Sequence, residues 1–104
     1  FSGMKAFKDE KKNIRLFRPL LNMNRLRNSC KRLTLPDFSP EELLECLKEL
    51  LKVERRWIPD KDQYSLYLRP NAIAYNSNLG IRVPTESMIY ICCAPVGPYY
   101  PSGF

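Results

Sequence analysis

The sequence predicts an α+β fold in which an antiparallel sheet carries two helices on one face. Two kinds of apolar spacing are the basis of this prediction. Apolar residues alternate in the segment 64–75, and the segment 87–94 is a short apolar run; both patterns are typical of strands. They recur at helical spacing near 22–33 and 39–57, as they do in helices that cover a sheet. A helix at 64–69 or 87–94 would contradict the prediction.

The chain opens with a predicted β-hairpin. Residues 1–7 (FSGMKAF) and 13–18 (NIRLFR) are typical of strands, and the charged run 8–12 joins them as a loop. We expect Pro19 to end the second strand.

The first helix is expected from about Asn22 to Leu33. Asn22 is a favourable N-cap, and Pro36 marks the end of the helical pattern. One apolar stripe is formed by Met23, Leu26, Cys30 and Leu33.

The second helix, at 39–57, has the clearest signals. Ser39 is the expected N-cap, Pro40 the first helical residue, and Glu42 completes a capping box. Phe38 and Leu43 have the spacing of a hydrophobic staple. The leucines 43, 44, 47, 50 and 51 are expected to face the core. The predicted core members are Leu26, Leu43, Leu47, Leu50 and Trp57.

In the segment 64–75 the alternation places Leu66 and Leu68 on one face and Tyr67 and Arg69 on the other. Pro70 indicates an edge or a local kink.

The segment 87–94 (SMIYICCA) is apolar on both faces, which predicts a central strand. A loop containing Asn76, Asn78 and Gly80 precedes it. The tail, rich in proline, is typical of a linker. We therefore assign residues 1–96 to one domain and 97–104 to the start of an interdomain linker.

The composition is that of an ordinary globular domain, with 44% apolar and 27% charged residues. The net charge of +6 is compatible with nucleic-acid binding. However, the basic residues are scattered and interrupted by glutamates, so a mildly basic enzyme surface is the simpler interpretation. No apolar run approaches the ~20 residues of a membrane span.

Cysteine and histidine usage limits the possible chemistry. Cys30 and Cys46 lie on predicted apolar stripes, while Cys92 and Cys93 are adjacent in a strand. Without histidine or a CxxC pair, we expect no zinc site and no Ser-His-Asp or Cys-His catalytic group. This cysteine usage fits a reducing compartment. Glycine-rich nucleotide loops are also missing from the sequence.

Three residues are candidates for binding anions. Tyr67 and Arg69 share the less apolar strand face, and an arginine fork binds carboxylate or phosphate. Arg25 is expected in the first turn of its helix, where the helix dipole favours anions. From the pattern alone, ordinary exposed arginines explain all of this more simply. The residues by themselves predict an α+β domain with possible anion sites.

Six segments in order nevertheless resemble one family: FSGMKAF, IRLFRPLLNMNR, LPDFSPEELLECLKELLKVERRWIP, SLYLRP, SNLGIRVPT and APVGPYYPSG. Together they resemble eukaryotic-type branched-chain amino acid aminotransferases, over essentially the whole chain. The resemblance implies the small domain of a fold type IV enzyme, a pyridoxal 5′-phosphate cofactor, amino-acid and 2-oxo-acid substrates, a homodimer, and a cytoplasmic or mitochondrial location. It implies no nucleic-acid or membrane partner.

The resemblance also implies roles for individual residues. Arg25 matches the arginine that contacts the cofactor phosphate. The substrate-pocket positions are matched by Phe1, Tyr67, Arg69 and Tyr99. Leu79 and Ile81 match a loop that reaches into the neighbouring subunit's pocket. In this chain FSG and NMNR replace the more usual FEG and NMDR, and Ile81 is larger than the usual valine.

No lysine here has the sequence context of the family's catalytic lysine, which lies in the large domain. We therefore expect the chain to be a small-domain fragment without transaminase activity of its own. Two alternatives remain at this point, a basic nucleic-acid-binding module and a regulatory interaction protein derived from the enzyme.

Overall fold

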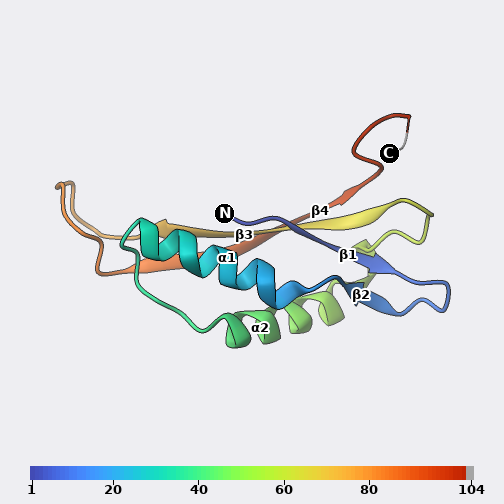
Figure 1. Cartoon of the computed structure of the whole chain (residues 1–104), viewed down its shortest axis with the longest axis horizontal. Helices are drawn as coiled ribbons and strands as arrows, with labels where there is room; N and C mark the ends of the chain where they lie inside the picture. The colour runs from blue at the N-terminus through green and yellow to red at the C-terminus, as the bar shows by residue number, and fades with distance from the viewer. Residues whose placement is uncertain (103–104) are drawn as a thin grey trace.

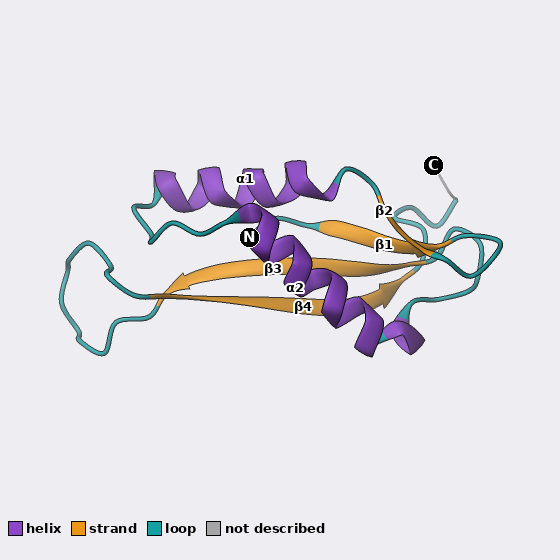
Figure 2. Ribbon diagram, turned by 90° about the horizontal axis from the view of Figure 1, so that it is seen from below, coloured by secondary structure: helices purple, strands orange, loops and turns teal. Residues whose placement is uncertain are grey.

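The computed structural model describes residues 1–102 and confirms the predicted α+β fold (Figure 1). Two helices lie on one face of a four-stranded antiparallel sheet with the order β2-β1-β3-β4 (Figure 2). Within residues 1–102, neither helix is long and apolar enough to cross a lipid bilayer. The elements are β1 (Met4–Lys8), β2 (Ile14–Leu16), α1 (Pro19–Arg32), α2 (Pro40–Val53), the 3-10 turn η1 (Arg55–Trp57), β3 (Ser65–Ala74) and β4 (Ser87–Val96).

The core lies between the helices and the strands β1 and β3. Because Met4 pairs with Leu68 and Ala6 with Leu66, these four side chains share the face under the helices. Their exposure is at most 8%. From the helical side and η1 the core is completed by Met23, Leu44, Leu47, Leu51 and Ile58. The predicted alternation of Leu66 and Leu68 with Tyr67 and Arg69 is therefore confirmed.

Helix α1 begins at Pro19, three residues before the predicted start, so Asn22 is not its N-cap. The flanking residue is Arg18, in the left-handed region with φ 48°, and Pro19 occupies the first helical position. Proline suits that position because its fixed φ is helical and its missing N–H would be unbonded there anyway. Met23, Leu26 and Cys30 are buried as predicted, but Leu33 follows the last helical residue and is 65% exposed.

Helix α2 has the predicted cap. The Ser39 hydroxyl accepts a hydrogen bond from the backbone N–H of Glu42 over 3.3 Å. The same hydroxyl donates to the Glu41 carboxylate over 3.2 Å, so Glu41 supplies the side chain that meets the cap.

The predicted core was wrong at the end of this helix. The helix stops at Val53 and the chain turns through η1, which leaves Trp57 51% exposed and buries Ile58 at 1%. Leu43 and Leu50 flank the core rather than fill it. The exposed Cys46 lies off the buried stripe of Leu44, Leu47 and Leu51, so its predicted burial was also wrong.

Strand β4 is an edge strand, not the predicted central one. Central position belongs to β3, which pairs with β1 and with β4. The apolar residues of β4 alternate between the face under the helices and the open face, and most are exposed. The linker predicted at 97–104 follows Val96, and its last two residues lie outside the described part of the chain.

Pro70 lies in β3 just beyond the ladder with β1, which ends at the Met4–Leu68 pair. Its carbonyl oxygen accepts a bond from the backbone N–H of Ser2 over 3.2 Å. The missing proline N–H therefore interrupts no regular pairing, in agreement with the predicted local edge.

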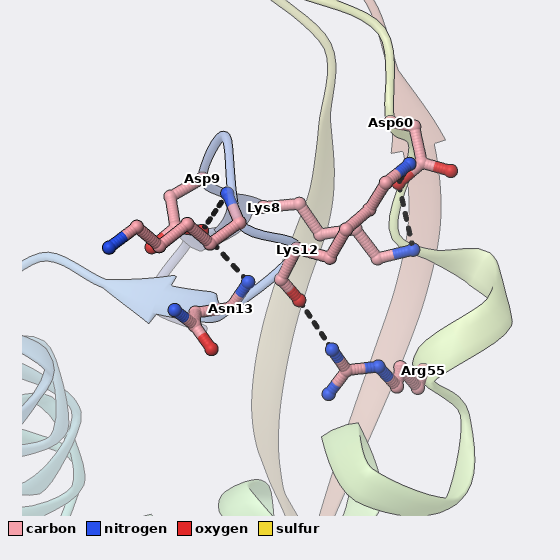
Figure 3. Close-up of polar contacts among 7 residues, drawn as sticks. Lys8, Asp9, Lys12, Asn13, Arg55 and Asp60 are labelled. Atoms are coloured by element: carbon pink, nitrogen blue, oxygen red, sulfur yellow. Dashed lines mark hydrogen bonds and ion pairs between the residues drawn. The ribbon is translucent and has the colours of Figure 1, made fainter.

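The β1–β2 hairpin is fastened to the loop before β3 (Figure 3). The Asp60 carboxylate pairs with Lys8 over 3.3 Å and with Lys12 over 3.2 Å, and these bonds hold the Asp60 pKa below its usual value. Arg55 donates to the Lys12 carbonyl oxygen. Within the turn, the Asp9 carboxylate accepts two backbone N–H groups. These contacts fix the start of the sheet.

Candidate functional site

The open face of the sheet, opposite the helices, carries the candidate site. Lys5 in β1 pairs with Tyr67 in β3, and Arg69 follows two residues later, so all three side chains share this face. They line an open hollow of about 480 Å³ together with Val96, Gly97, Pro98 and Tyr99. The structure thus brings together three of the predicted site residues, Tyr67, Arg69 and Tyr99.

Arg69 is the centre of this group. Its Nε donates to the Tyr67 hydroxyl over 3.3 Å, and its guanidinium carbon lies 5.3 Å from the centroid of the Tyr67 ring. On its other side the guanidinium lies 4.4 Å from the centroid of the Phe1 ring. Phe1 therefore belongs to the same cluster, and the guanidinium of Arg69 contacts the rings of both Phe1 and Tyr67.

The charge of the hollow suits an anion. Within residues 1–102, neither Lys5 nor Arg69 is paired with a carboxylate, whereas most of the described ion pairs lie around the hairpin and along the helices. Two cations beside aromatic and apolar walls match a ligand with a carboxylate at one end and an apolar group at the other. The sequence analysis missed Lys5, although its place two residues from Phe7 and Gly3 on an alternating strand could have indicated it.

Arg25 does not lie where the sequence predicted. Because α1 starts at Pro19, Arg25 is in the second turn, and the unbonded N–H groups of the helix start are not beside it. Its Nε donates to the Ser2 hydroxyl over 2.9 Å and its Nη2 to the Gly3 carbonyl over 3.0 Å. Any anion that it binds must rely on the guanidinium itself.

The guanidinium still has capacity for a phosphate. An arginine has five N–H donors, and the two bonds to Ser2 and Gly3 leave three of them. The residue is exposed, so those donors face outward. The donor set fits an anionic group such as a phosphate.

The segment before β1 is hydrogen-bonded to α1 by a small network that the sequence analysis missed. The Ser2 hydroxyl donates to the Asn22 carbonyl over 3.3 Å, and Asn22 Nδ2 donates to the Gly3 carbonyl over 3.2 Å. Ser2 is only 4% exposed. These bonds join residues about twenty positions apart, which sequence spacing does not reveal.

Leu79 and Ile81 are not part of this cluster. They lie in the β3–β4 loop, which extends beyond one end of the sheet (Figure 1). Both side chains are fully exposed.

The adjacent cysteines of β4 point to opposite faces. Cys92 lies on the open face, where its Sγ is 4.0 Å from Asn71 Nδ2. Cys93 faces the helical side next to Trp57, and partial burial raises the pKa of its thiol. A raised pKa disfavours the reactive thiolate, so the surroundings of Cys93 do not activate it as a nucleophile.

Comparison with known proteins gives a consistent result. No protein-family model matches the chain. It is 49% identical, over its whole length, to a branched-chain-amino-acid aminotransferase of Dictyostelium discoideum. It is 46% identical to the mitochondrial enzyme of Rattus norvegicus over 97% of the chain, and 46% identical to the cytosolic enzyme of Ovis aries over 99%. The chain spans about a quarter of the length of these relatives, between 26% and 28%.

Proposed function

Because the chain is homologous over its whole length to branched-chain-amino-acid aminotransferases, we propose that the polypeptide carrying it is a transaminase dependent on pyridoxal 5′-phosphate. It moves the amino group of leucine, isoleucine or valine to 2-oxoglutarate, giving the branched-chain 2-oxo acid and glutamate. The single observation that carries this proposal is the identity of 41–49% along the chain to eight aminotransferases.

The hollow on the open face supports this substrate class. Arg69 is suited to bind a carboxylate through its fork, and its bond to Tyr67 holds that fork in one orientation. Phe1 and Tyr99 supply apolar surface for the branched side chain. A site built in this way accepts both the amino acid and the 2-oxo acid, since both have a carboxylate.

Arg25 is proposed to hold the cofactor phosphate with the donors that Ser2 and Gly3 leave free. When bound, the cofactor supplies the electron-withdrawing ring that makes the α-proton of the amino acid acidic. The residues of the 104-residue chain bind and orient the cofactor and the substrate. The lysine that bonds the cofactor is expected in the large domain, so the 104-residue chain alone should not transaminate.

A homodimer is part of the proposal. Leu79 and Ile81 are large apolar side chains that lie fully in solvent in the single chain. Neighbouring exposed apolar residues that form a patch often mark a contact with another subunit. The relatives include proteins named mitochondrial and proteins named cytosolic, so a cytoplasmic and a mitochondrial location both fit.

The proposal is tested by expressing the full-length polypeptide and incubating it with leucine, 2-oxoglutarate and pyridoxal 5′-phosphate. Glutamate should form in amounts equal to the 2-oxo acid released from leucine. Removing the cofactor with hydroxylamine and dialysis should stop the reaction, and adding pyridoxal 5′-phosphate should restore it. If no glutamate forms with leucine, with isoleucine or with valine as the amino donor, the proposal is refuted.

A further inference from the structure

Gly3 and Tyr67 approach one another too closely for any side chain at position 3. A Cβ built on Gly3 would lie 2.5 Å from the Tyr67 hydroxyl oxygen and 3.0–3.1 Å from the ring atoms Cε1 and Cζ. Two carbon-sized atoms normally stay about 3.5 Å or more apart. The Tyr67 phenol thus packs directly on the Gly3 backbone.

The need for glycine here is a matter of space, not of backbone conformation. The positive-φ residues of the described chain other than glycine are Lys12, Arg18, Thr34 and Gln63, and Gly3 has no positive φ either. An alanine could therefore adopt the Gly3 backbone conformation without strain. What it could not do is leave Tyr67 in place.

The backbone at Gly3 has little freedom to yield. Its carbonyl oxygen accepts bonds from Arg25 over 3.0 Å and from Asn22 over 3.2 Å. On the other side of the segment, the backbone N–H of Ser2 is bonded to the Pro70 carbonyl over 3.2 Å. Helix α1 and strand β3 therefore hold this segment from both sides, and an added methyl group would move the Tyr67 ring instead.

From these contacts we propose that Gly3 is a positioning residue that sets the place of the Tyr67 hydroxyl in the substrate pocket. The proposal deepens the proposed function and rests on it for the role of the pocket. The same peptide connects two parts of the site, because its carbonyl is held by Arg25 while its Cα supports Tyr67. Displacing Tyr67 also removes its 3.3 Å bond to Arg69, so the carboxylate-binding fork loses its support.

The kinetic test is a double-mutant cycle in the full-length polypeptide, using Gly3→Ala, Tyr67→Phe and the double variant. In the parent, Gly3→Ala should lower kcat/KM for leucine by roughly 10- to 100-fold, as a misplacement of about 1 Å does. Most of the loss should appear in KM. In the Tyr67→Phe background the same change should cost only roughly 3-fold, because the hydroxyl to be misplaced is already gone. Equal losses in both backgrounds, or no loss in the parent, would overturn the proposal.

A second measurement covers the case in which Gly3→Ala unfolds the protein. Thermal unfolding is measured for the parent, for each single variant Gly3→Ala and Tyr67→Ala, and for the combined variant, since Tyr67→Ala removes the whole ring. A smaller loss of melting temperature from Gly3→Ala in the Tyr67→Ala background than in the parent supports the contact, whereas equal losses overturn it. Gly80→Ala is the matched control for stability, because the nearest atom to its added methyl group lies 3.6 Å away.

The two hypotheses fail in different ways. If the parent does not transaminate, the proposed function fails and with it the pocket role of Gly3, while the unfolding comparison still decides whether Gly3 and Tyr67 are in contact. If the parent transaminates and Gly3→Ala matches it, only the positioning role fails.

Discussion

Arg69 donates a hydrogen bond from Nε to the hydroxyl oxygen of Tyr67, two residues earlier on the same face of β3. The bond leaves the Tyr67 hydroxyl proton free to donate to a ligand in the hollow. The two residues therefore act as one unit that presents both a neutral and a charged donor.

Replacing Tyr67 by Phe in the full-length polypeptide should mainly alter substrate kinetics. The KM for leucine should rise roughly 5- to 20-fold, since a hydrogen bond of about 1–1.5 kcal/mol is lost and Arg69 loses its partner. The cofactor dissociation constant should stay within about 2-fold of the parent value. Steady-state kinetics and a cofactor titration measure the two. Tyr75→Phe, at a tyrosine that is more than half exposed, is the control. An unchanged KM would contradict the assignment.

Arg25→Ala should weaken cofactor retention by roughly 10- to 100-fold, because charge-assisted hydrogen bonds are worth about 1.5–3 kcal/mol each. Arg25→Lys should recover only part of the loss, since it keeps the charge without the fork. The structure adds a second effect. Arg25 also holds Ser2 and Gly3, so Arg25→Ala should loosen the segment before β1. A cofactor titration measures the first effect and hydrogen exchange at Ser2 to Met4 the second.

The control for this variant is Arg32→Ala, an exposed arginine in the last turn of the same helix. It should bind the cofactor as the parent does. Equal cofactor dissociation constants for the parent and Arg25→Ala would refute the phosphate role. They would leave the bonds to Ser2 and Gly3 untouched.

Truncating Ile58 to alanine should destabilise the fold more than truncating Trp57, although Trp57 has the larger side chain. Ile58 is 1% exposed inside the core, so Ile58→Ala should lower the free energy of unfolding by about 2–5 kcal/mol. Trp57 is 51% exposed, so Trp57→Ala should cost less than about 1.5 kcal/mol despite the larger side chain. Urea unfolding of the two variants gives the comparison. A larger loss of unfolding free energy for Trp57→Ala would contradict the structure and support the sequence-based prediction that Trp57 lies in the core.

Features with local causes were predictable from the sequence. The Ser39 cap and Pro40 are adjacent signals, and the structure has both. The alternation that separates Leu66 and Leu68 from Tyr67 and Arg69 depends only on the period of a strand. The start of α1 failed because two signals competed, and Pro19 at the first helical position prevailed over Asn22 as a cap.

Features that depend on distant segments were not predictable in the same way. Apolar periodicity shows which faces of β4 are apolar, but it does not show whether another strand lies beside it. The sequence therefore predicted a central strand where the sheet has an edge. The hydrogen bonds of Arg25 to Ser2 and Gly3 span more than twenty residues, and no local pattern encodes them. Tyr67, Arg69 and Tyr99 meet only because β4 returns antiparallel to β3 and delivers the residues after Val96 beside them.

Acid should remove the contribution of the Asp37–Arg27 pair to stability in a defined pH window. Two bonds of 2.7 and 2.8 Å join the side chains, and the bond from Arg27 lowers the pKa of Asp37 from 3.8 to about 2. A depressed pKa in the folded state stabilises the fold above the unfolded value, and this contribution is lost as pH falls through the folded value. Asp37→Asn should therefore melt below the parent at neutral pH, with the difference shrinking between pH 3.8 and about 2.

The control for the acid experiment is Asp62→Asn, at an exposed aspartate that is not in an ion pair within residues 1–102. Its melting temperature should follow that of the parent across the whole range. A pH-independent difference between the parent and Asp37→Asn would contradict the pairing.

The exposed loop residues provide the last prediction, which concerns the neighbouring subunit. Leu79 is fully exposed in the single chain, so Leu79→Ala should leave the unfolding of this domain within about 0.5 kcal/mol of the parent. If the side chain enters the pocket of a second subunit, the same variant should raise the KM for leucine several-fold in the full-length dimer, because one to three methylene-sized contacts are lost there. Val83→Ala is the control, since Val83 is a 65% exposed residue of the same loop.

Mixed dimers give the decisive measurement for Leu79. In a dimer of one Leu79→Ala subunit and one subunit that carries both Tyr67→Phe and Arg25→Ala, the pocket with intact Tyr67 and Arg25 lies in the Leu79→Ala subunit. The partner of that subunit still has Leu79. That pocket should have the parent KM if Leu79 acts in trans, and the raised KM of the Leu79→Ala variant if it acts within its own chain.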